Sequence, residues 1–214
     1  MDQDIEIINT QTNIEKMKNL FINNKKIIIS LISIIILSIF LVFFYFEFKE
    51  SKKNKLSNEY NDTITNFKSK INDNTVEKLK NLIMEKDSTY SPLALYFLID
   101  NDLIKSKDEI NNFFNIIIND INLDEEIKYL IIYKKALYNS ELVNEDELLN
   151  ILSPVISSES IWKSHALYLM AEYFFSKGEK IKSKEFFEQI LSLENSNQNI
   201  KIEAEKRIKR DFSE

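Results

Sequence analysis

The chain has 214 residues and a net charge of −6, and it contains one glycine, two prolines and no cysteine. The negative charge disfavours binding to nucleic acid or to anionic lipid, and the lack of cysteine excludes disulfides and thiolate metal sites. Tight β-turns and phosphate-binding loops need glycine, so the composition predicts an all-α fold and excludes Walker and dinucleotide-binding loops.

Residues 1–26 form a neutral N-terminal tail. Ile14, Met17 and Leu20 recur there at helical spacing, which predicts a short amphipathic helix over 12–24. Its apolar face is suited either to a membrane surface or to a partner protein.

An uncharged apolar run covers residues 27–46, directly after two lysines. Twenty residues of helix span about 30 Å, which is the thickness of a bilayer core. The run leads into aromatic residues and then lysines, a pattern typical of a membrane interface. A signal peptide instead has a shorter core followed by small residues. We therefore expect an uncleaved transmembrane anchor over 27–48, with a removed signal sequence as the alternative.

The orientation of this anchor does not follow from its flanking charges. Four lysines lie on each side: Lys16, Lys18, Lys25 and Lys26 before it, and Lys49, Lys52, Lys53 and Lys55 after it. Because orientation follows an excess of positive charge on the cytoplasmic side, an equal count leaves both topologies open.

Helical periodicity continues beyond the anchor. We expect a connecting helix over 49–73 and then a helical-repeat domain over 74–214. Capping residues and helix breakers divide this domain. The predicted helices cover 74–86, 92–105, 107–119, 124–138, 144–152, 161–177, 180–193 and 198–211. In particular, Ser91 is predicted to cap the second of them, Pro154 to end the fifth and Gly178 to end the sixth.

Short motifs recur 72–73 residues apart in this domain. Ala94-Leu95-Tyr96 returns as Ala166-Leu167-Tyr168, and Phe113-Phe114 returns as Phe186-Phe187. This spacing equals two units of about 36 residues, the period of helix-turn-helix solenoids of the tetratricopeptide type. The predicted fold is therefore all-α, with one transmembrane helix followed by a tetratricopeptide-like α-solenoid.

A concave groove is the best candidate for a binding site in such a solenoid. The residues expected to line it share one face of the first helix in each repeat, where a tyrosine precedes an acid by four residues. They are Tyr96 and Asp100 in one repeat, with Leu93 and Leu103 beside them, and His165, Tyr168, Glu172 and Phe175 in the other. Such a surface suits an extended polypeptide. In the alternative interpretation the tyrosines only fill space between repeats.

Catalytic and metal-binding constellations are missing from the sequence. His165 is the only histidine, and neither a second metal ligand nor a nucleophile is spaced to work with it. Acidic clusters such as 124–126 and 145–147 lie at predicted helix starts, where they favour the helix dipole. We expect no enzyme activity, no cofactor, no metal site and no small-molecule substrate.

The whole layout resembles a bacterial inner-membrane family whose best-known member is the ancillary SecYEG translocon subunit. The resemblance rests on the tail from Glu15 to Phe21, the single anchor with its aromatic–basic end, the entry Ile161-Trp162-Lys163-Ser164-His165-Ala166 into the last repeat, and Phe186-Phe187 in the following helix. It implies a cytoplasmic N-terminus and a periplasmic domain. The implied partners are translocon subunits, periplasmic chaperones and newly exported chains.

The expected function is that of a membrane-anchored, non-enzymatic protein-binding adaptor at the export machinery. One alternative is a helical-repeat scaffold for cell division or envelope assembly, which would use the same surface on different partners. A cytoplasmic C-terminal domain is a further alternative. Partner identity and membrane topology separate these possibilities.

Overall fold

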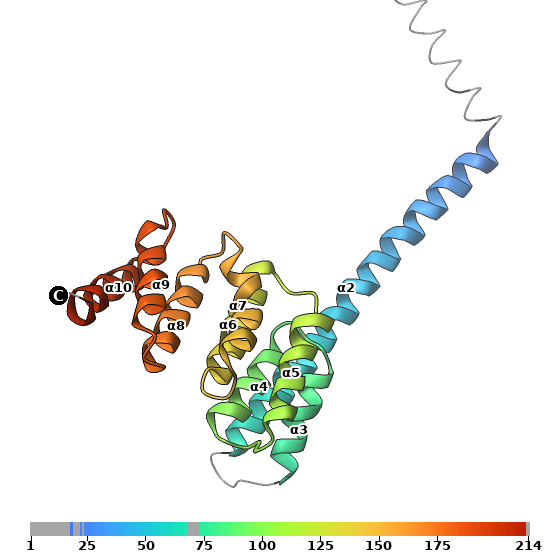
Figure 1. Cartoon of the computed structure of the whole chain (residues 1–214). Helices are drawn as coiled ribbons and strands as arrows, with labels where there is room; N and C mark the ends of the chain where they lie inside the picture. Colours follow the sequence, from blue (N-terminus) through green and yellow to red (C-terminus); the bar gives the residue numbers. More distant parts are fainter. Residues whose placement is uncertain (1–17, 19–21, 23, 68–72, 213–214) are drawn as a thin grey trace, which may run out of the picture. The chain divides into compact units, whose positions relative to one another are not determined.

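The computed structural model describes residues 18, 22, 24–67 and 73–212. Within them the chain is all-α, without a β-strand, and it divides into two compact units, Met1–Lys55 and Leu56–Glu214. The helix predicted over 12–24 lies outside the described residues except for residues 18 and 22. The predicted fold class, a long apolar helix followed by a series of packed helices, is confirmed (Figure 1).

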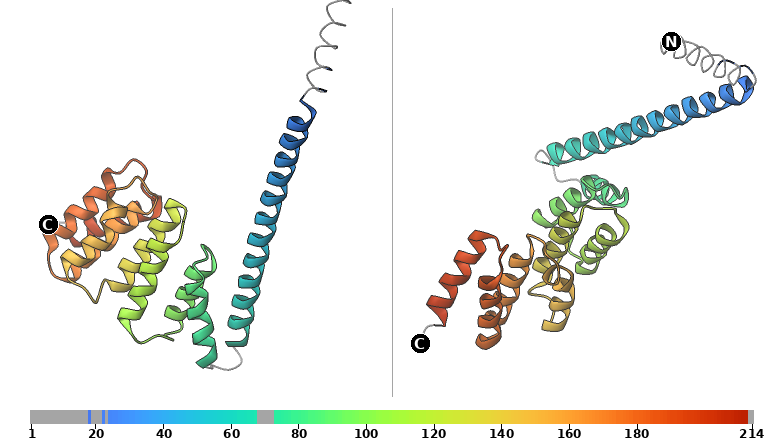
Figure 2. Two further views of the ribbon diagram at one scale, coloured as in Figure 1. Left: turned by 90° about the vertical axis from the view of Figure 1, so that its right-hand side faces the viewer. Right: turned by 90° about the horizontal axis from the view of Figure 1, so that it is seen from above.

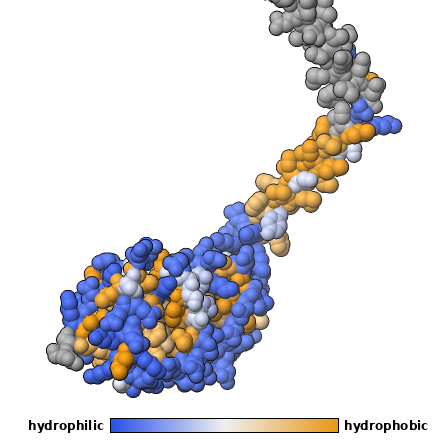
Figure 3. Space-filling view, turned by 45° about the horizontal axis from the view of Figure 1, so that its top comes forward, coloured by the Kyte–Doolittle hydropathy of each residue, from blue (hydrophilic) through white to orange (hydrophobic). Residues whose placement is uncertain are grey.

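Helix α2 (Lys25–Phe67) carries the apolar run. By length and composition, it is the one helix among the described residues that is suited to crossing a membrane, as an anchor or as a signal sequence. Figure 3 shows the apolar side chains as an orange surface along this part of α2. The hydroxyls of Ser33 and Ser38 donate to the carbonyls four residues earlier, at 2.9 Å each. These serines are therefore satisfied within their own helix.

The second unit begins with the last turns of α2, from Leu56 on, and continues through a series of helices in chain order (Figure 2). The helices that follow α2 are α3 (Asp73–Met84), α4 (Tyr90–Asp100), α5 (Lys107–Asp120), α6 (Glu125–Asn139), α7 (Glu145–Ile156), α8 (Lys163–Ser176), α9 (Lys180–Ser192) and α10 (Gln198–Asp211).

Most predicted helix boundaries follow from local capping. The side chains of Ser106, Asp124 and Asn144 each accept a hydrogen bond from a backbone N–H in the first turn of the following helix. At the end of α8, Gly178 has φ = +79°, and the Glu179 N–H donates to the Phe174 carbonyl at 2.9 Å. This is the Schellman arrangement, in which glycine avoids a Cβ clash.

Two boundaries of α4 differ from the prediction. Ser91 does not cap it: the helix begins earlier, and the buried Ser91 hydroxyl donates to the Leu82 carbonyl at 3.0 Å. Instead, the Asp87 carboxylate accepts from the N–H groups of Thr89 and Tyr90. The helix also ends at Asp100, five residues early, because Asp102 adopts φ = +50°.

Helix α7 also differs from the prediction, because it continues past Pro154 to Ile156. Proline removes one backbone hydrogen bond within a helix. The last turn still forms, since the Ser157 N–H donates to the Ser153 carbonyl at 3.0 Å. Val155 is fully buried in this turn, and burial of its side chain offsets the lost hydrogen bond.

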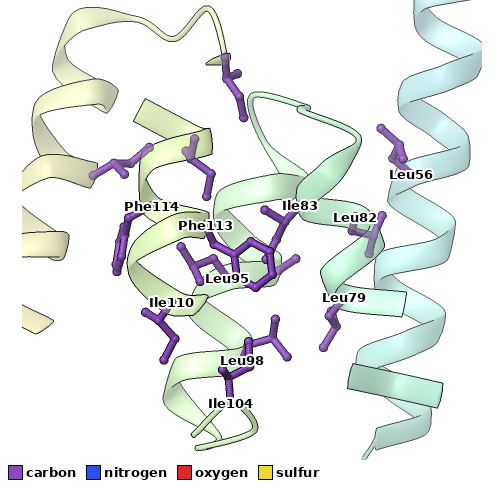
Figure 4. Close-up of a cluster of buried hydrophobic side chains, with 14 residues drawn as sticks. Leu56, Leu79, Leu82, Ile83, Leu95, Leu98, Ile104, Ile110, Phe113 and Phe114 are labelled. Atoms are coloured by element: carbon purple, nitrogen blue, oxygen red, sulfur yellow. The ribbon is translucent and has the colours of Figure 1, made fainter. Parts of the chain in front are cut away.

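Three apolar clusters form the core of the second unit. The first contains Leu56 of α2 together with residues of α3, α4 and α5 (Figure 4). The second contains residues of α6, α7 and α8, and the third contains residues of α8, α9 and α10. Motif pairs 72–73 residues apart are buried alike: Leu95 and Leu167 are at most 1% exposed, as are Phe114 and Phe187. The sequence repeat is thus a repeat of core positions.

A small residue on each helix lets α8 and α9 cross closely. Ala171 and Ser183 are both fully buried, and the Ser183 hydroxyl donates to the Ala171 carbonyl at 2.8 Å. Repeats of this type usually have alanine at the position of Ser183. Serine is tolerated here because its hydroxyl has a hydrogen-bond partner.

Candidate functional site

A groove runs between α4 and α6, the first helices of two successive hairpins. We call it the α4–α6 groove and define it by six side chains that line it: Leu93, Tyr96, Asp100, Ile127, Lys134 and Leu137. It comprises two hollows of about 240 and 420 Å³ that share Tyr96. The smaller hollow lies toward the C-terminal ends of both helices and the larger one toward their N-terminal ends.

The walls of the groove are largely apolar yet accessible. Leu93, Ile127 and Leu137 are 39%, 43% and 45% exposed, whereas core leucines and isoleucines of the same helices are almost fully buried. Helical spacing explains this pattern for Leu93 and Leu137, because both lie on the face of their helix opposite the core stripe. The groove therefore presents apolar surface that the described residues of the second unit leave accessible.

Tyr96 lies where the two hollows meet. Its hydroxyl is buried and has no hydrogen-bond partner among the described residues. Burial raises the pKa of Tyr96 to about 12, so the hydroxyl stays protonated and remains a hydrogen-bond donor. The Lys134 ammonium lies 5.7 Å from the centre of the Tyr96 ring, within the range of a cation–π contact.

The equivalent residues of the last repeat lie at a covered junction. Tyr168 packs on Phe187 with ring centres 5.4 Å apart, and Phe175 packs on Phe212 at 5.8 Å. The Arg207 guanidinium of α10 lies over the Phe175 ring at 4.3 Å and binds both carboxylate oxygens of Glu172. Helix α10 thus covers the part of the expected groove formed by Tyr168, Glu172 and Phe175.

His165 lies at neither of these two places. Its ring is 5.0 Å from Trp162 and 5.8 Å from Tyr133, so it belongs to the contact between α6 and α8. Burial lowers the pKa of His165, and this effect outweighs the opposing one of the Ile161 carbonyl. The expected groove residues therefore fall at three successive junctions. Leu93, Tyr96 and Asp100 line the α4–α6 groove, whereas Leu103 packs against the first apolar cluster.

Sequence reasoning missed the residues contributed by α6. Ile127, Lys134 and Leu137 complete the groove, but their repeat departs most from the motif shared by the other two. One signal was present in the sequence: Lys134 and Arg207 are 73 residues apart, the same spacing as the two Phe-Phe pairs. A cation therefore recurs opposite each tyrosine–acid pair.

Among the described residues no group of three or more histidine, cysteine or acidic side chains is arranged to hold a metal ion. No known protein family, curated protein or solved structure matches the chain.

Proposed function

We propose that this chain is a membrane-anchored, non-enzymatic adaptor that binds other polypeptides in the α4–α6 groove. The observation that carries the proposal is the accessible apolar lining at Leu93, Ile127 and Leu137, next to the exposed charged groups of Asp100 and Lys134. Polypeptide offers both the apolar side chains and the hydrogen-bonding groups that such a surface needs.

Tethering provides the mechanism. An anchor confines the groove to the membrane surface, which raises its effective concentration there and lets a weak site capture chains that pass nearby. We further propose that α2 is the uncleaved anchor, that the second unit is periplasmic, and that the partners belong to the Sec export machinery. The support for this part is the resemblance of the tail, anchor and last repeat to the translocon-associated family.

Purification of the native complex from membranes tests the proposal. Leu137→Asp places a charge in the groove, and Ile181→Asp places the same charge on α9, where Ile181 is 79% exposed. We expect translocon subunits, periplasmic chaperones or exported chains to copurify with the wild-type chain and the Ile181 variant. The Leu137 variant should lose most of them.

Two outcomes would contradict this account. Equal recovery with both variants would exclude the α4–α6 groove as the binding surface. Recovery of division or envelope-assembly proteins in place of export proteins would replace the adaptor role by the scaffold role.

A further inference from the structure

Two junctions of the second unit are copies of one another in sequence. On the first helix of each, a tyrosine is followed four residues later by an acid: Tyr96 and Asp100 on α4, Tyr168 and Glu172 on α8. On the helix opposite, a cation faces this pair, Lys134 on α6 and Arg207 on α10. The two tyrosines are 72 residues apart, as are the two acids, and the two cations are 73 residues apart.

The α8–α10 copy is closed. The Arg207 Nε and Nη2 atoms donate to the two Glu172 oxygens at 2.7 and 2.9 Å, and Arg207 also pairs with Asp211. The Arg207 side chain is only 12% exposed. A bidentate pair of this kind is among the stronger polar contacts in proteins, and it holds the two helices together.

The α4–α6 copy is open, and its residue types explain why. Aspartate is one methylene shorter than glutamate, and lysine lacks the planar fork that binds both carboxylate oxygens. Within the part of the chain that the structure describes, no ion pair joins Asp100 to Lys134. Both instead line the hollow of about 240 Å³.

We infer that the α4–α6 groove binds the main chain of an extended, apolar-rich polypeptide, which bridges Asp100 and Lys134. This inference rests on the proposed function and specifies its ligand. A backbone N–H would donate to the Asp100 carboxylate, and a backbone carbonyl would accept from the Lys134 ammonium, both of which are exposed. Alternate side chains of the bound segment would lie against Leu93, Ile127 and Leu137.

The same chemistry argues for an extended segment and against a helix. A helix uses its N–H and carbonyl groups internally, so its main chain could not bind Asp100 and Lys134. An extended chain offers both groups at every residue and needs no particular sequence to do so. Asp100 and Lys134 carry opposite charges, and the main chain offers both a donor and an acceptor without net charge. A charged ligand side chain would be repelled by one of these two residues.

Binding of a defined peptide to the full chain in detergent micelles tests the inference. The probe is an eight-residue leucine- and alanine-rich peptide, acetylated and amidated to remove its terminal charges, with a fluorescent label for anisotropy. We expect at least tenfold weaker binding when its two central amides are N-methylated, because hydrogen bonds to charged groups are lost. An analogue rich in α-aminoisobutyrate, which is held helical, should bind at least tenfold more weakly too.

A double variant closes the open copy. Asp100→Glu with Lys134→Arg reproduces the pair of the α8–α10 junction, and we expect it to lower peptide affinity at least tenfold without lowering the unfolding midpoint. The control makes the same chemical changes at exposed positions of α5, Asp108→Glu with Lys107→Arg, and should bind like the wild type.

The outcomes separate this inference from the proposed function. Equal affinity for the N-methylated and parent peptides, or unchanged affinity in the closing variant, would overturn main-chain recognition. Loss of partners from the Leu137→Asp variant in native membranes would still support the proposed function in that case. If no peptide binds and Leu137→Asp retains all partners, both proposals are wrong.

Discussion

At the scale of single residues, Asp102 and Gly178 end their helices in the same way. Both have positive φ, +50° and +79°, and in both places the next residue donates its N–H to a carbonyl of the last helical turn. Only glycine adopts this conformation without a clash of Cβ. We expect Asp102→Gly to raise the free energy of unfolding by about 0.5–1 kcal/mol and Gly178→Ala to lower it by about 1 kcal/mol.

Urea unfolding of the full chain in micelles measures both changes. Nothing lies within 4 Å of a Cβ added at Gly178, so backbone strain alone is at stake there. Asp102→Gly also removes the ion pair between Asp102 and Lys105. Both side chains of this pair are more than three-quarters exposed, so the pair contributes little to stability. Destabilisation by Asp102→Gly would contradict this reading of the α4 end.

His165 gives the second unit a pH dependence with a definite sign. Burial lowers its pKa, so the folded state favours the neutral ring. Above the ordinary value of about 6.5, both the folded and the unfolded chain carry the neutral ring. As the pH falls below that value, the unfolded chain takes up a proton that the folded chain resists, and the free energy of unfolding decreases.

Comparison of His165→Gln with the wild type isolates this contribution. Between pH 7.5 and 5.5 we expect the wild-type free energy of unfolding to fall more steeply than that of the variant. Parallel pH profiles, or a wild type that gains stability toward pH 5.5, would contradict the assigned sign.

Helix α10 provides a prediction at the scale of elements. Ala204 is its only fully buried residue, the partly buried Ile200 and Ile208 pack on the third cluster, and Arg207 pairs with Glu172. We expect Arg207→Met to lower the free energy of unfolding by about 1–3 kcal/mol, because Glu172 and Asp211 lose a shared, largely buried cation. In this variant, amide hydrogen exchange should become faster than in the wild type in α10, and it should change less in α4 and α5.

Lys206→Met is the matched control, because it removes the same charge from the neighbouring position. The Lys206 side chain is 65% exposed and pairs with Glu203 one turn away, so we expect a change within about 0.5 kcal/mol. Equal effects of the two substitutions would show that α10 is held by its apolar residues and not by the Arg207 pair.

The elements also show what sequence can and cannot predict. Periodicity and local caps predicted the position of every helix from α3 to α10, because the signals for them lie within a few residues of each boundary. The start of α4 and the end of α7 departed from prediction because packing against other helices decided them. Ser91 bonds to Leu82 in the preceding helix, and Val155 is buried in the second cluster with residues of α6 and α8.

The candidate site was half predictable for the same reason. Tyr96 and Asp100 were marked by the repeat, and they do line the groove. That α10 covers Tyr168, Glu172 and Phe175 depends on Arg207, which the motif did not include. The contribution of α6 was hidden because Lys134 and Leu137 sit in the repeat that diverges most. A repeat predicts shared core positions better than it predicts which junction stays open.

Membrane topology is the first prediction at the scale of the whole molecule. We expect α2 to remain attached to the membrane after alkaline extraction, since a cleaved signal would release the second unit. In intact spheroplasts, added protease should degrade the C-terminal domain, because we propose that it is periplasmic. Protection from protease would assign the domain to the cytoplasm and exclude exported chains as ligands.

Photocrosslinking in native membranes tests the central claim, that the α4–α6 groove binds polypeptide beside the export machinery, most directly. A photoreactive phenylalanine analogue at Leu137 places the probe in the groove, and the same analogue at Ile181 probes an exposed apolar position on α9. We expect adducts with translocon subunits, chaperones or exported chains from position 137 and not from position 181. Adducts of equal yield at both positions, or none at position 137, would contradict the account.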